Sequence, residues 1–275
     1  MARHFSLAKM VFVMPRPIIT LTTDFGVSSP YVAAMKGVIL SIHPDVNIVD
    51  ITHAVPPQDI LSGAQTLATA TPWFPPGTIH VAVVDPGVGT ARGIVYARFG
   101  EQHYVAPDNG LLSGLARRSP PDKIVAVTRR EHWGPVVSAT FHGRDIMAPV
   151  AARLCGGLSP DDLGAAQGAL VKLDWPEVRI VPGKVQGSIT AIDSFGNLIT
   201  NITQEMLSSA PRGEQTRITC DEHQTQGIFE TYADQPEMTL LALFGSSGHL
   251  ELAIVGDSAK AMLGVGVGTP VEVAW

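Results

Sequence analysis

The most constraining stretch of the sequence is an apolar run that ends at an acidic, glycine-rich loop. Residues Val81–Val84 are all apolar, and Asp85 follows them directly. Such an uninterrupted run is typical of a strand buried on both faces of a parallel sheet. Asp85 would then lie at the carboxyl edge, where open α/β sheets bind ligands, and Gly87 and Gly89 would let the loop turn sharply. A plain Asp-Pro-Gly turn explains this stretch alone equally well.

The sequence on both sides of this stretch alternates between strand and helix patterns. Strands are expected over residues 18–22, 46–51, 79–84, 104–106 and 123–128, and helices over residues 31–42, 59–71, 111–117 and 138–152. This alternation predicts an α/β domain with a central, mainly parallel sheet.

Three of the predicted strands end in an aspartate. Asp24 follows the first strand, Asp85 the third, and Asp108, with Asn109 beside it, follows the fourth. The carboxyl ends of parallel strands meet at one edge of a sheet. The recurrence of aspartate at this position therefore predicts a shared polar cleft.

A second polar cluster stands at the entrance of the helix expected before residue 152. His142, Arg144 and Asp145 lie within four residues of one another. These side chains could belong to the same cleft. Asp145 could equally serve the helix itself, as a negative charge in the first turn that complements the helix dipole.

The pattern changes near residue 176, where helical segments give way to short strands. These are expected over residues 183–192, 198–202, 217–220, 239–244, 250–254 and 269–273. We therefore expect residues 1–17 to be a poorly ordered leader, residues 18–175 the α/β domain, and residues 176–275 a smaller, mainly antiparallel β domain. The turns at residues 193–197 and 245–248 are more often plain hairpin loops than ligand clamps.

Composition narrows the class of protein. The chain of 275 residues is 45% apolar and 16% charged, which indicates a folded protein, and its net charge of −6 gives no general basic field for nucleic acid. No apolar run is long enough to cross a membrane. Cys155 and Cys220 lie far apart, which argues against a disulfide framework or a zinc knuckle and favours the cytoplasm. No His-x-x-x-His spacing suggests a metal-dependent hydrolase.

Seven segments taken together resemble one known family. They are TDFG at 23–26, VDITH at 49–53, VVDPGVGTAR at 83–92, APDNGLL at 106–112, TFHGRD at 140–145, IDSFGNLITNI at 192–202 and SSGHLELA at 246–253. They resemble, in order and across both predicted domains, the S-adenosyl-L-methionine hydroxide adenosyltransferase family, which is related to the bacterial fluorinase and chlorinase.

The resemblance implies an activity, an assembly and a set of catalytic residues. The implied reaction is S-adenosylmethionine plus water giving adenosine and L-methionine, with S-adenosylmethionine as substrate and with no cofactor and no metal. The implied assembly is a homotrimer with its sites at subunit interfaces. The catalytic set corresponds to Asp85, Arg92 and His142. Arg92 would stabilise hydroxide charge, while Asp85 and His142 would orient a water molecule and accept or relay its proton.

Substrate contacts follow from the same resemblance. Asp24 corresponds to the carboxylate that binds the ribose hydroxyls, Asp193 and Ser246 to the methionine contacts, and Phe195 and Asn197 to positions near the adenosine. Asp108, Asn109 and Glu251 complete the predicted substrate-binding set. The family usually has asparagine where Gly245 stands and an aspartate near Ser29, so these two loops depart from the pattern.

Two other functions fit the same motifs. A halogenating relative would use chloride or fluoride at the same 5′ carbon, but the carboxylate of Asp85 would repel an anion, and the fluorinase has an aromatic residue at that position. A non-catalytic adenosine or S-adenosylmethionine binder would have no need of Asp85, Arg92 and His142 together.

Overall fold

The computed structural model describes residues 16–275, which divide between Leu173 and Asp174 into two compact units. Most of the leader expected over residues 1–17 lies outside the described residues. The sequence predicted the division between domains after residue 175. Each unit has its own sheet and its own apolar core.

The first unit is built on a six-stranded mixed sheet with the strand order β2-β1-β3-β5-β4-β6. Strands β2, β1, β3 and β5 are parallel to one another, whereas β4 runs antiparallel to both of its neighbours, β5 and β6. This confirms the predicted α/β fold. The strands are β1 (Ile18–Thr23), β2 (Asn47–Thr52), β3 (Ile79–Val83), β4 (Ile94–Phe99), β5 (Gln102–Pro107) and β6 (Lys123–Ala126).

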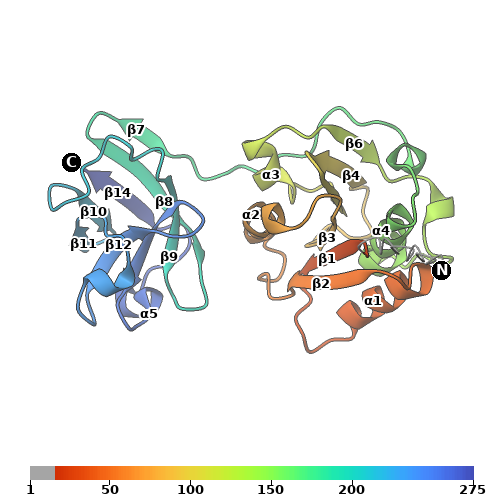
Figure 1. The fold of residues 1–275 in the computed structure, drawn as a ribbon, viewed down its shortest axis with the longest axis horizontal. Helices are drawn as coiled ribbons and strands as arrows, with labels where there is room; N and C mark the ends of the chain where they lie inside the picture. Colours follow the sequence, from red (N-terminus) through yellow and green to blue (C-terminus); the bar gives the residue numbers. More distant parts are fainter. Residues whose placement is uncertain (1–15) are drawn as a thin grey trace, which may run out of the picture. The chain divides into compact units, whose positions relative to one another are not determined.

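Helices cover both faces of this sheet (Figure 1). On one face α1 packs against α4, with Met35 and Ile39 buried. On the other face α2 packs against α3, with Leu67 and Leu115 buried. Because both faces are covered, β3 can be buried along its whole length, as its apolar sequence predicted. The helices are α1 (Tyr31–Ile42), α2 (Ile60–Ala70), α3 (Ser113–Arg118) and α4 (Ala148–Cys155).

The strand order places a crevice at the carboxyl ends of β1 and β3. From β1 the chain crosses through α1 to β2 on one side, and from β2 it crosses through α2 to β3 on the other side of β1. The connections that leave β1 and β3 therefore diverge. In open α/β sheets, ligands bind at such a switch in strand order.

The helix predicted over residues 138–152 begins later and differently. A short π-helix, η3 (Gly143–Met147), precedes α4, and His142 is the residue before it. π-Helical turns are rare and often occur at functional sites, because they change the direction in which neighbouring side chains point. None of the helices in residues 16–275 has both the length and the apolar character needed to cross a bilayer.

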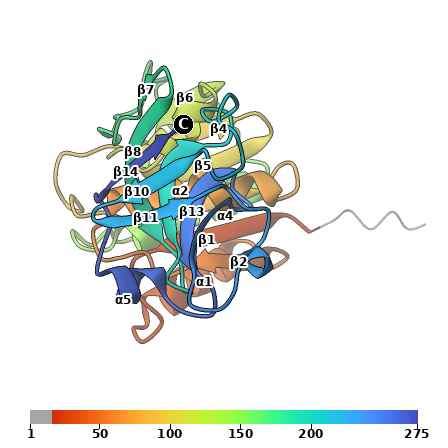
Figure 2. The same cartoon turned by 90° about the vertical axis from the view of Figure 1, so that its left-hand side faces the viewer.

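The second unit is an eight-stranded antiparallel sheet, which confirms the predicted β-rich character (Figure 2). The strand order is β11-β10-β14-β8-β9-β13-β12, and β7 also pairs with β8. The core is formed by side chains such as Val185, Ile189, Leu198 and Leu250. The strands are β7 (Arg179–Val181), β8 (Lys184–Ile192), β9 (Leu198–Thr203), β10 (Arg217–Cys220), β11 (His223–Gln226), β12 (Leu240–Phe244), β13 (His249–Ile254) and β14 (Pro270–Ala274). The remaining helical elements are short. In the first unit they are η1 (Thr71–Trp73), η2 (Arg130–His132) and η4 (Pro160–Leu163), and in the second unit they are η5 (Tyr232–Asp234) and α5 (Ala259–Leu263).

Candidate active site

A cavity of about 280 Å³ lies where β1 and β3 end. Two predicted strand-end aspartates, Asp24 and Asp85, line it together with His142, so the fold brings together residues far apart in the sequence. The full lining is Asp24, Phe25, Gln58, Val83, Asp85, Pro86, Val88, Thr140, Phe141, His142 and Gly143.

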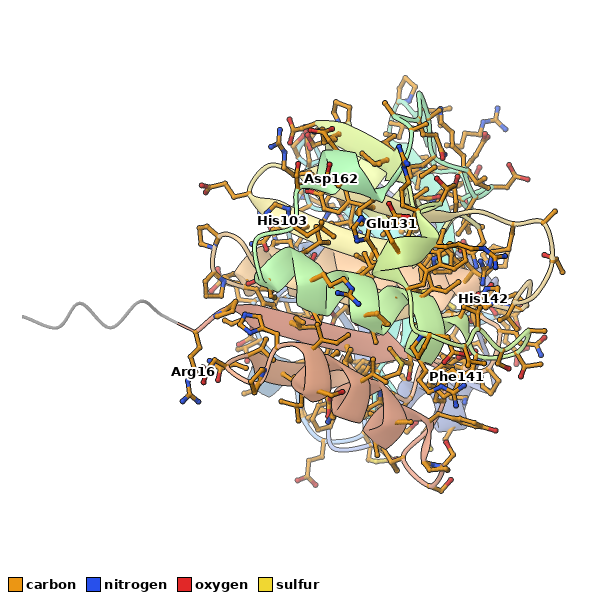
Figure 3. All side chains as sticks on the ribbon, turned by 90° about the vertical axis from the view of Figure 1, so that its right-hand side faces the viewer. Arg16, His103, Glu131, Phe141, His142 and Asp162 are labelled. Carbon is orange, nitrogen blue, oxygen red and sulfur yellow. The ribbon has the colours of Figure 1, made fainter. Side chains whose placement is uncertain are left out.

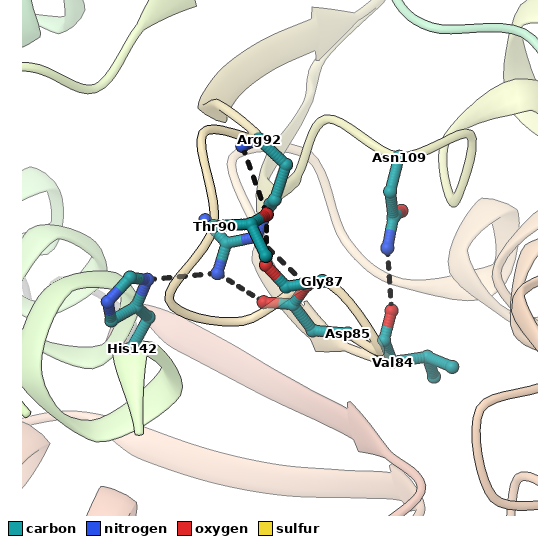
Figure 4. A network of polar contacts seen from close by, with 7 residues as sticks. All are labelled: Val84, Asp85, Gly87, Thr90, Arg92, Asn109 and His142. Carbon is teal, nitrogen blue, oxygen red and sulfur yellow. Dashed lines mark hydrogen bonds and ion pairs between the residues drawn. The ribbon is translucent and has the colours of Figure 1, made fainter. Parts of the chain in front are cut away.

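Asp85, Arg92 and His142 form one hydrogen-bonded network (Figure 4). Arg92 binds the carboxylate of Asp85 in a bidentate pair, with Nε 2.8 Å from Oδ1 and Nη2 bonded to Oδ2. The same Nη2 donates a hydrogen bond of 2.9 Å to His142 Nδ1. The Asp85 side chain is 4% exposed and that of Arg92 10%, so solvent screens this ion pair little.

The contact with Arg92 fixes the tautomer of His142. A guanidinium only donates hydrogen bonds, so His142 Nδ1 must accept one and carries no proton. Burial lowers the pKa of His142 below its usual 6.5, and the charge of Arg92 lowers it further, against the opposite effects of Asp85 and Asp145. His142 is therefore neutral, with its proton on Nε2, and that nitrogen is a hydrogen-bond donor.

The loop from Asp85 to Arg92 owes its shape to a close backbone approach. Gly89 has a φ of +78°, and a Cβ at this position would lie 2.3 Å from the carbonyl oxygen of Ala139. Thr90 Oγ1 donates to the Gly87 carbonyl at 2.7 Å and tightens the turn. The loop that carries Arg92 thus lies directly against the segment that leads to His142.

Asp145 fastens that segment from the other side. Its buried carboxylate accepts a hydrogen bond from the Ser138 amide at 2.8 Å and one from Arg144 Nε at 2.6 Å. The side chain thus holds the loop before His142 rather than capping a regular helix. Figure 3 shows Phe141 and His142 at the same end of the first sheet.

Aromatic rings form one wall of the cavity. Phe25 and Phe141 line it and pack edge to face with each other and with Tyr31, which lies behind them, with ring centroids 5.2–5.7 Å apart. The guanidinium of Arg144 lies 4.8 Å from the centroid of Phe141. Phe25 and Phe141 were quoted in the sequence motifs but not predicted as site residues. Their burial against each other depends on two chain segments more than a hundred residues apart.

The Asp24 carboxylate is held by a backbone amide. Its Oδ2 accepts from the Gln58 amide at 2.9 Å, and Gln58 has a φ of +65°. Gln58 also lines the cavity, a position that the sequence did not predict. Left-handed backbone at a residue other than glycine is uncommon, and no sequence signal distinguishes it here.

Asp108 and Asn109 are engaged elsewhere and do not line the cavity. Asp108 accepts from Gln167 Nε2 at 2.6 Å and from the Val171 amide at 2.9 Å. Asn109 Nδ2 donates to the Val84 carbonyl at 2.9 Å (Figure 4). The Asn109 contact ties its loop to the end of β3, and the Asp108 contacts tie residues 167–171 to the end of β5. A direct role in substrate binding remains a prediction for both residues.

A second group of predicted site residues lies in the turn of the C-terminal unit. Asp193 accepts from the amides of Phe195 at 2.9 Å and Asn197 at 2.8 Å, and from Asn197 Nδ2 at 2.9 Å. These hydrogen bonds hold the turn in place, whereas Phe195 within it is 78% exposed.

Glu251 joins this turn through a residue that the sequence analysis missed. Tyr232 donates to Glu251 Oε2 at 3.2 Å and lies 3.5 Å from Asn197 Nδ2. Burial raises the pKa of Glu251, and burial together with Glu251 raises the pKa of Tyr232 to about 12. A Cβ at Gly245 would lie 1.7 Å from Glu251 Oε1. The glycine that departs from the family pattern therefore makes room for this carboxylate, next to Ser246.

No metal centre is apparent in the part of the chain that the structure describes. Residues 16–275 contain no group of three or more His, Cys, Asp or Glu side chains with the geometry of a metal site. Near the cavity, Asp85 instead pairs with Arg92, Asp145 pairs with Arg144, and Asp24 accepts from a backbone amide.

Comparison with known proteins places this geometry in a family. The model of the SAM (S-adenosylmethionine) hydroxide adenosyltransferase N-terminal domain matches residues 19–164, and that of the C-terminal domain matches residues 187–272. The chain belongs to the SAM hydroxide adenosyltransferase family. The resemblance inferred from the seven sequence motifs is thus confirmed.

The hydrolases among the relatives are similar to this chain over nearly their full length. The (R)-S-adenosyl-L-methionine hydrolase of Salinispora tropica is 39% identical over 262 residues, which cover 94% of this chain and 98% of that protein. The hydrolase of the same name from Thermus thermophilus is 36% identical over 265 residues, covering 94% and 99%. A fluorinase of an Actinoplanes species is 31% identical over 229 residues, which cover 74% of this chain and 77% of that protein. The crystal structure of an uncharacterized conserved protein from Thermotoga maritima, 34% identical, has a TM-score of 0.89 and covers 94% and 100%.

Proposed function

We propose that this family member hydrolyses (R)-S-adenosyl-L-methionine to adenosine and L-methionine. The observation that carries the proposal is the Asp85–Arg92–His142 network beside the cavity. Hydrolase relatives of 34–39% identity over nearly the whole chain support the same activity.

The chemistry of the substrate decides what the protein must supply. The sulfonium makes methionine a neutral leaving group, so the sulfur needs no acid and no metal. The nucleophile is scarce at neutral pH. Hydroxide must be held in line behind the 5′ carbon; its oxygen forms the new bond while the electron pair of the C–S bond passes to sulfur.

Arg92 and His142 suit the binding of hydroxide. Both are hydrogen-bond donors, Arg92 by its guanidinium and neutral His142 by Nε2–H, and donors directed at a developing or captured oxyanion stabilise it. The tautomer gives His142 a narrower role than the sequence analysis expected. Its Nδ1 is occupied by Arg92, so the ring orients the nucleophile rather than accepting its proton.

Asp85 then has three tasks. It fixes the Arg92 guanidinium through two hydrogen bonds. Its negative charge opposes entry of a halide, which must arrive as an anion, whereas hydroxide forms in place from a neutral water. Halogenation is thereby disfavoured relative to hydrolysis. Asp85 also remains the carboxylate to which a bound water could give its proton.

The other predicted site residues are assigned to substrate binding. We propose that Asp24 binds the ribose hydroxyls, and that Asp193, Phe195, Asn197, Ser246 and Glu251 contact the adenosine and methionine parts. A cytoplasmic homotrimer, with each site shared between subunits, is part of the same proposal.

The test is incubation with S-adenosylmethionine in ¹⁸O-labelled water, with and without chloride. We expect labelled oxygen in the 5′ hydroxyl of adenosine and no chlorinated nucleoside. The sulfonium sulfur is a stereocentre, so the two sulfur epimers should be assayed separately, and the (R) form should react faster. Unlabelled adenosine or a chlorinated product would refute the proposal.

A further inference from the structure

His53 joins the two loops that form one side of the cavity. It follows β2 directly, and its side chain is 7% exposed. Its Nδ1 lies 2.9 Å from Thr23 Oγ1, and its Nε2 lies 3.1 Å from Asp50 Oδ1. Neither the sequence motifs nor the proposed mechanism gives this histidine a role.

The direction of each hydrogen bond follows from the groups involved. Burial alone would raise the pKa of Asp50, but Lys36 and the nearby His53 ring lower it, so Asp50 is a carboxylate. His53 Nε2 faces this carboxylate at 3.1 Å without the alignment of a hydrogen bond, and the negative charge favours the proton on Nε2, so Nδ1 accepts from the Thr23 hydroxyl. The Thr23 oxygen is then free to accept from the Phe25 amide, 3.2 Å away.

Backbone contacts extend this connection to Asp24. The Gly26 amide donates to the His53 carbonyl at 2.8 Å, so both the ring and the backbone of His53 hold the segment around Asp24. Five residues after His53, the Gln58 amide donates to Asp24 Oδ2 at 2.9 Å. Asp24 is thus bonded to the connector that begins at His53, and its two neighbours are bonded to His53 itself or to its partner Thr23.

We infer that His53 is a positioning residue that holds the Asp24 carboxylate in place for the two ribose hydroxyls. This inference rests on the proposed function, in which Asp24 binds the ribose. Binding two adjacent hydroxyls requires an acceptor of fixed orientation, because a rotated carboxylate reaches only one of them.

Asp50, on the side of the His53 ring away from Thr23, is itself held in place by α1. Asp50 Oδ2 accepts from Lys36 Nζ on α1 at 2.6 Å, so the Asp50 carboxylate is held between α1 and the His53 ring. The ring cannot turn away from Thr23 without leaving Asp50 as well.

Two substitutions of His53 by amide residues separate its contact with Thr23 from its contact with Asp50. His53→Asn places an amide oxygen near the position of Nδ1 and can still accept from Thr23. His53→Gln extends its amide toward Asp50 and leaves Thr23 without its acceptor. We expect the dissociation constant for adenosine to rise about 5- to 10-fold in His53→Gln and less than about 2-fold in His53→Asn, with kcat for S-adenosylmethionine nearly unchanged in both. Equal weakening in the two variants would overturn the inference.

A double-mutant cycle with Asp24→Ala tests whether His53 acts through Asp24. In the Asp24→Ala background, His53→Gln should change adenosine affinity by less than about 2-fold, since nothing is left to position. Additive effects would mean an independent, merely structural role. If His53→Gln does not fold, Thr23→Val removes the hydroxyl in the same shape, and Thr23→Ser is its matched control.

Failure of the inference and failure of the proposed function give different results. If the wild type neither binds adenosine nor hydrolyses S-adenosylmethionine, the proposed function is wrong. If the wild type does both and Asp24→Ala weakens binding while the His53 and Thr23 variants do not, only the role of His53 is wrong.

Discussion

The Nδ1 atom of His142 decides which role the ring can have in the proposed reaction. Because Arg92 donates to Nδ1, the neutral ring can only offer Nε2–H to the cavity. The histidine of this network therefore differs from a general base whose free nitrogen takes a proton. The same Nη2 atom binds Asp85, so loss of that carboxylate should release both Arg92 and His142.

Asp85→Asn is the sharpest test of this unit. The change keeps the size of the side chain but removes its charge and one acceptor of the bidentate pair, so we expect hydrolysis to fall about 100-fold or more. Substrate affinity should change little. Single-turnover rates and equilibrium binding measure the two effects separately.

Asp122→Asn is a suitable control, because that carboxylate accepts from the Gly100 amide in an exposed turn away from the cavity lining. It should hydrolyse at the wild-type rate. A wild-type rate in Asp85→Asn would make Asp85 a turn residue.

The lowered pKa of His142 sets the acid limb of the pH profile. A protonated ring carries hydrogen on Nδ1 and can no longer accept from Arg92, so kcat/KM should fall as the pH drops through a value below 6.5. The apparent pKa belongs to the coupled network of Asp85, Arg92 and His142. A profile measured from about pH 4.5 to 9 checks this; an acid limb with its midpoint at or above 6.5 would contradict it.

The loop between β3 and β4 shows how an element imposes the site geometry. Gly89→Ala would place a methyl group 2.3 Å from the Ala139 carbonyl and so push the Arg92 loop away from the segment of His142. We expect activity to fall about 10-fold or more, since small misplacements of catalytic groups have large effects.

Gly100→Ala is a matched control for this change. Gly100 also has a positive φ, +57°, but no atom lies within 4 Å of the place that the added methyl group would take. Both variants should lose about 1 kcal/mol of stability from backbone strain, Gly89→Ala should lose more because of its contact with Ala139, and only Gly89→Ala should lose activity. Equal activity in the two variants would show that the close approach to Ala139 is unimportant.

A buried histidine in β3 makes stability depend on pH. His80 is fully buried, with Nδ1 2.7 Å from Thr20 Oγ1 and Nε2 3.2 Å from Gln102 Oε1, and burial lowers its pKa to about 4. Since the unfolded state binds its proton at about pH 6.5, the contribution is complete above that pH and is lost as the pH falls toward 4.

The expected loss at about pH 4 is about 3 kcal/mol. Urea unfolding at about pH 7.5 and about pH 4.5 measures it, with His80→Gln as the variant that cannot titrate. The wild type should lose more free energy of unfolding between the two pH values than the variant does. An equal loss would assign the pH dependence to other groups.

At the scale of the whole molecule, the predicted assembly is a homotrimer. Light scattering should give about 87 kDa, three times the 29.1 kDa chain. If each site combines two subunits, mixing inactive Asp85→Asn and Asp193→Asn chains under exchange should restore activity in about a quarter of the sites. A monomer, or no recovered activity in mixed trimers, would contradict a shared site.

The sequence by itself determined the fold class and the family, and it predicted the proposed catalytic set. Apolar runs such as Val81–Val84 are typical of a sheet covered on both faces, and aspartates at the ends of parallel strands share an edge. These rules depend on local pattern, so Asp24 and Asp85 could be assigned to one cleft without coordinates. β4 was missed although its Ile-Val-Tyr-Ala sequence is rich in strand-forming residues.

The tertiary structure alone decided which polar groups meet and which way each hydrogen bond runs. Asp24, Asp85 and Asp108 look alike in sequence, but only the first two line the cavity, because Gln167 and the Val171 amide engage the third. The tautomer of His142, the role of Gly89 and the contacts of His53 depend on segments 30 to 50 residues apart. Sequence patterns report burial and turn preference within a few residues, whereas hydrogen-bond partners are set by the packing of distant segments.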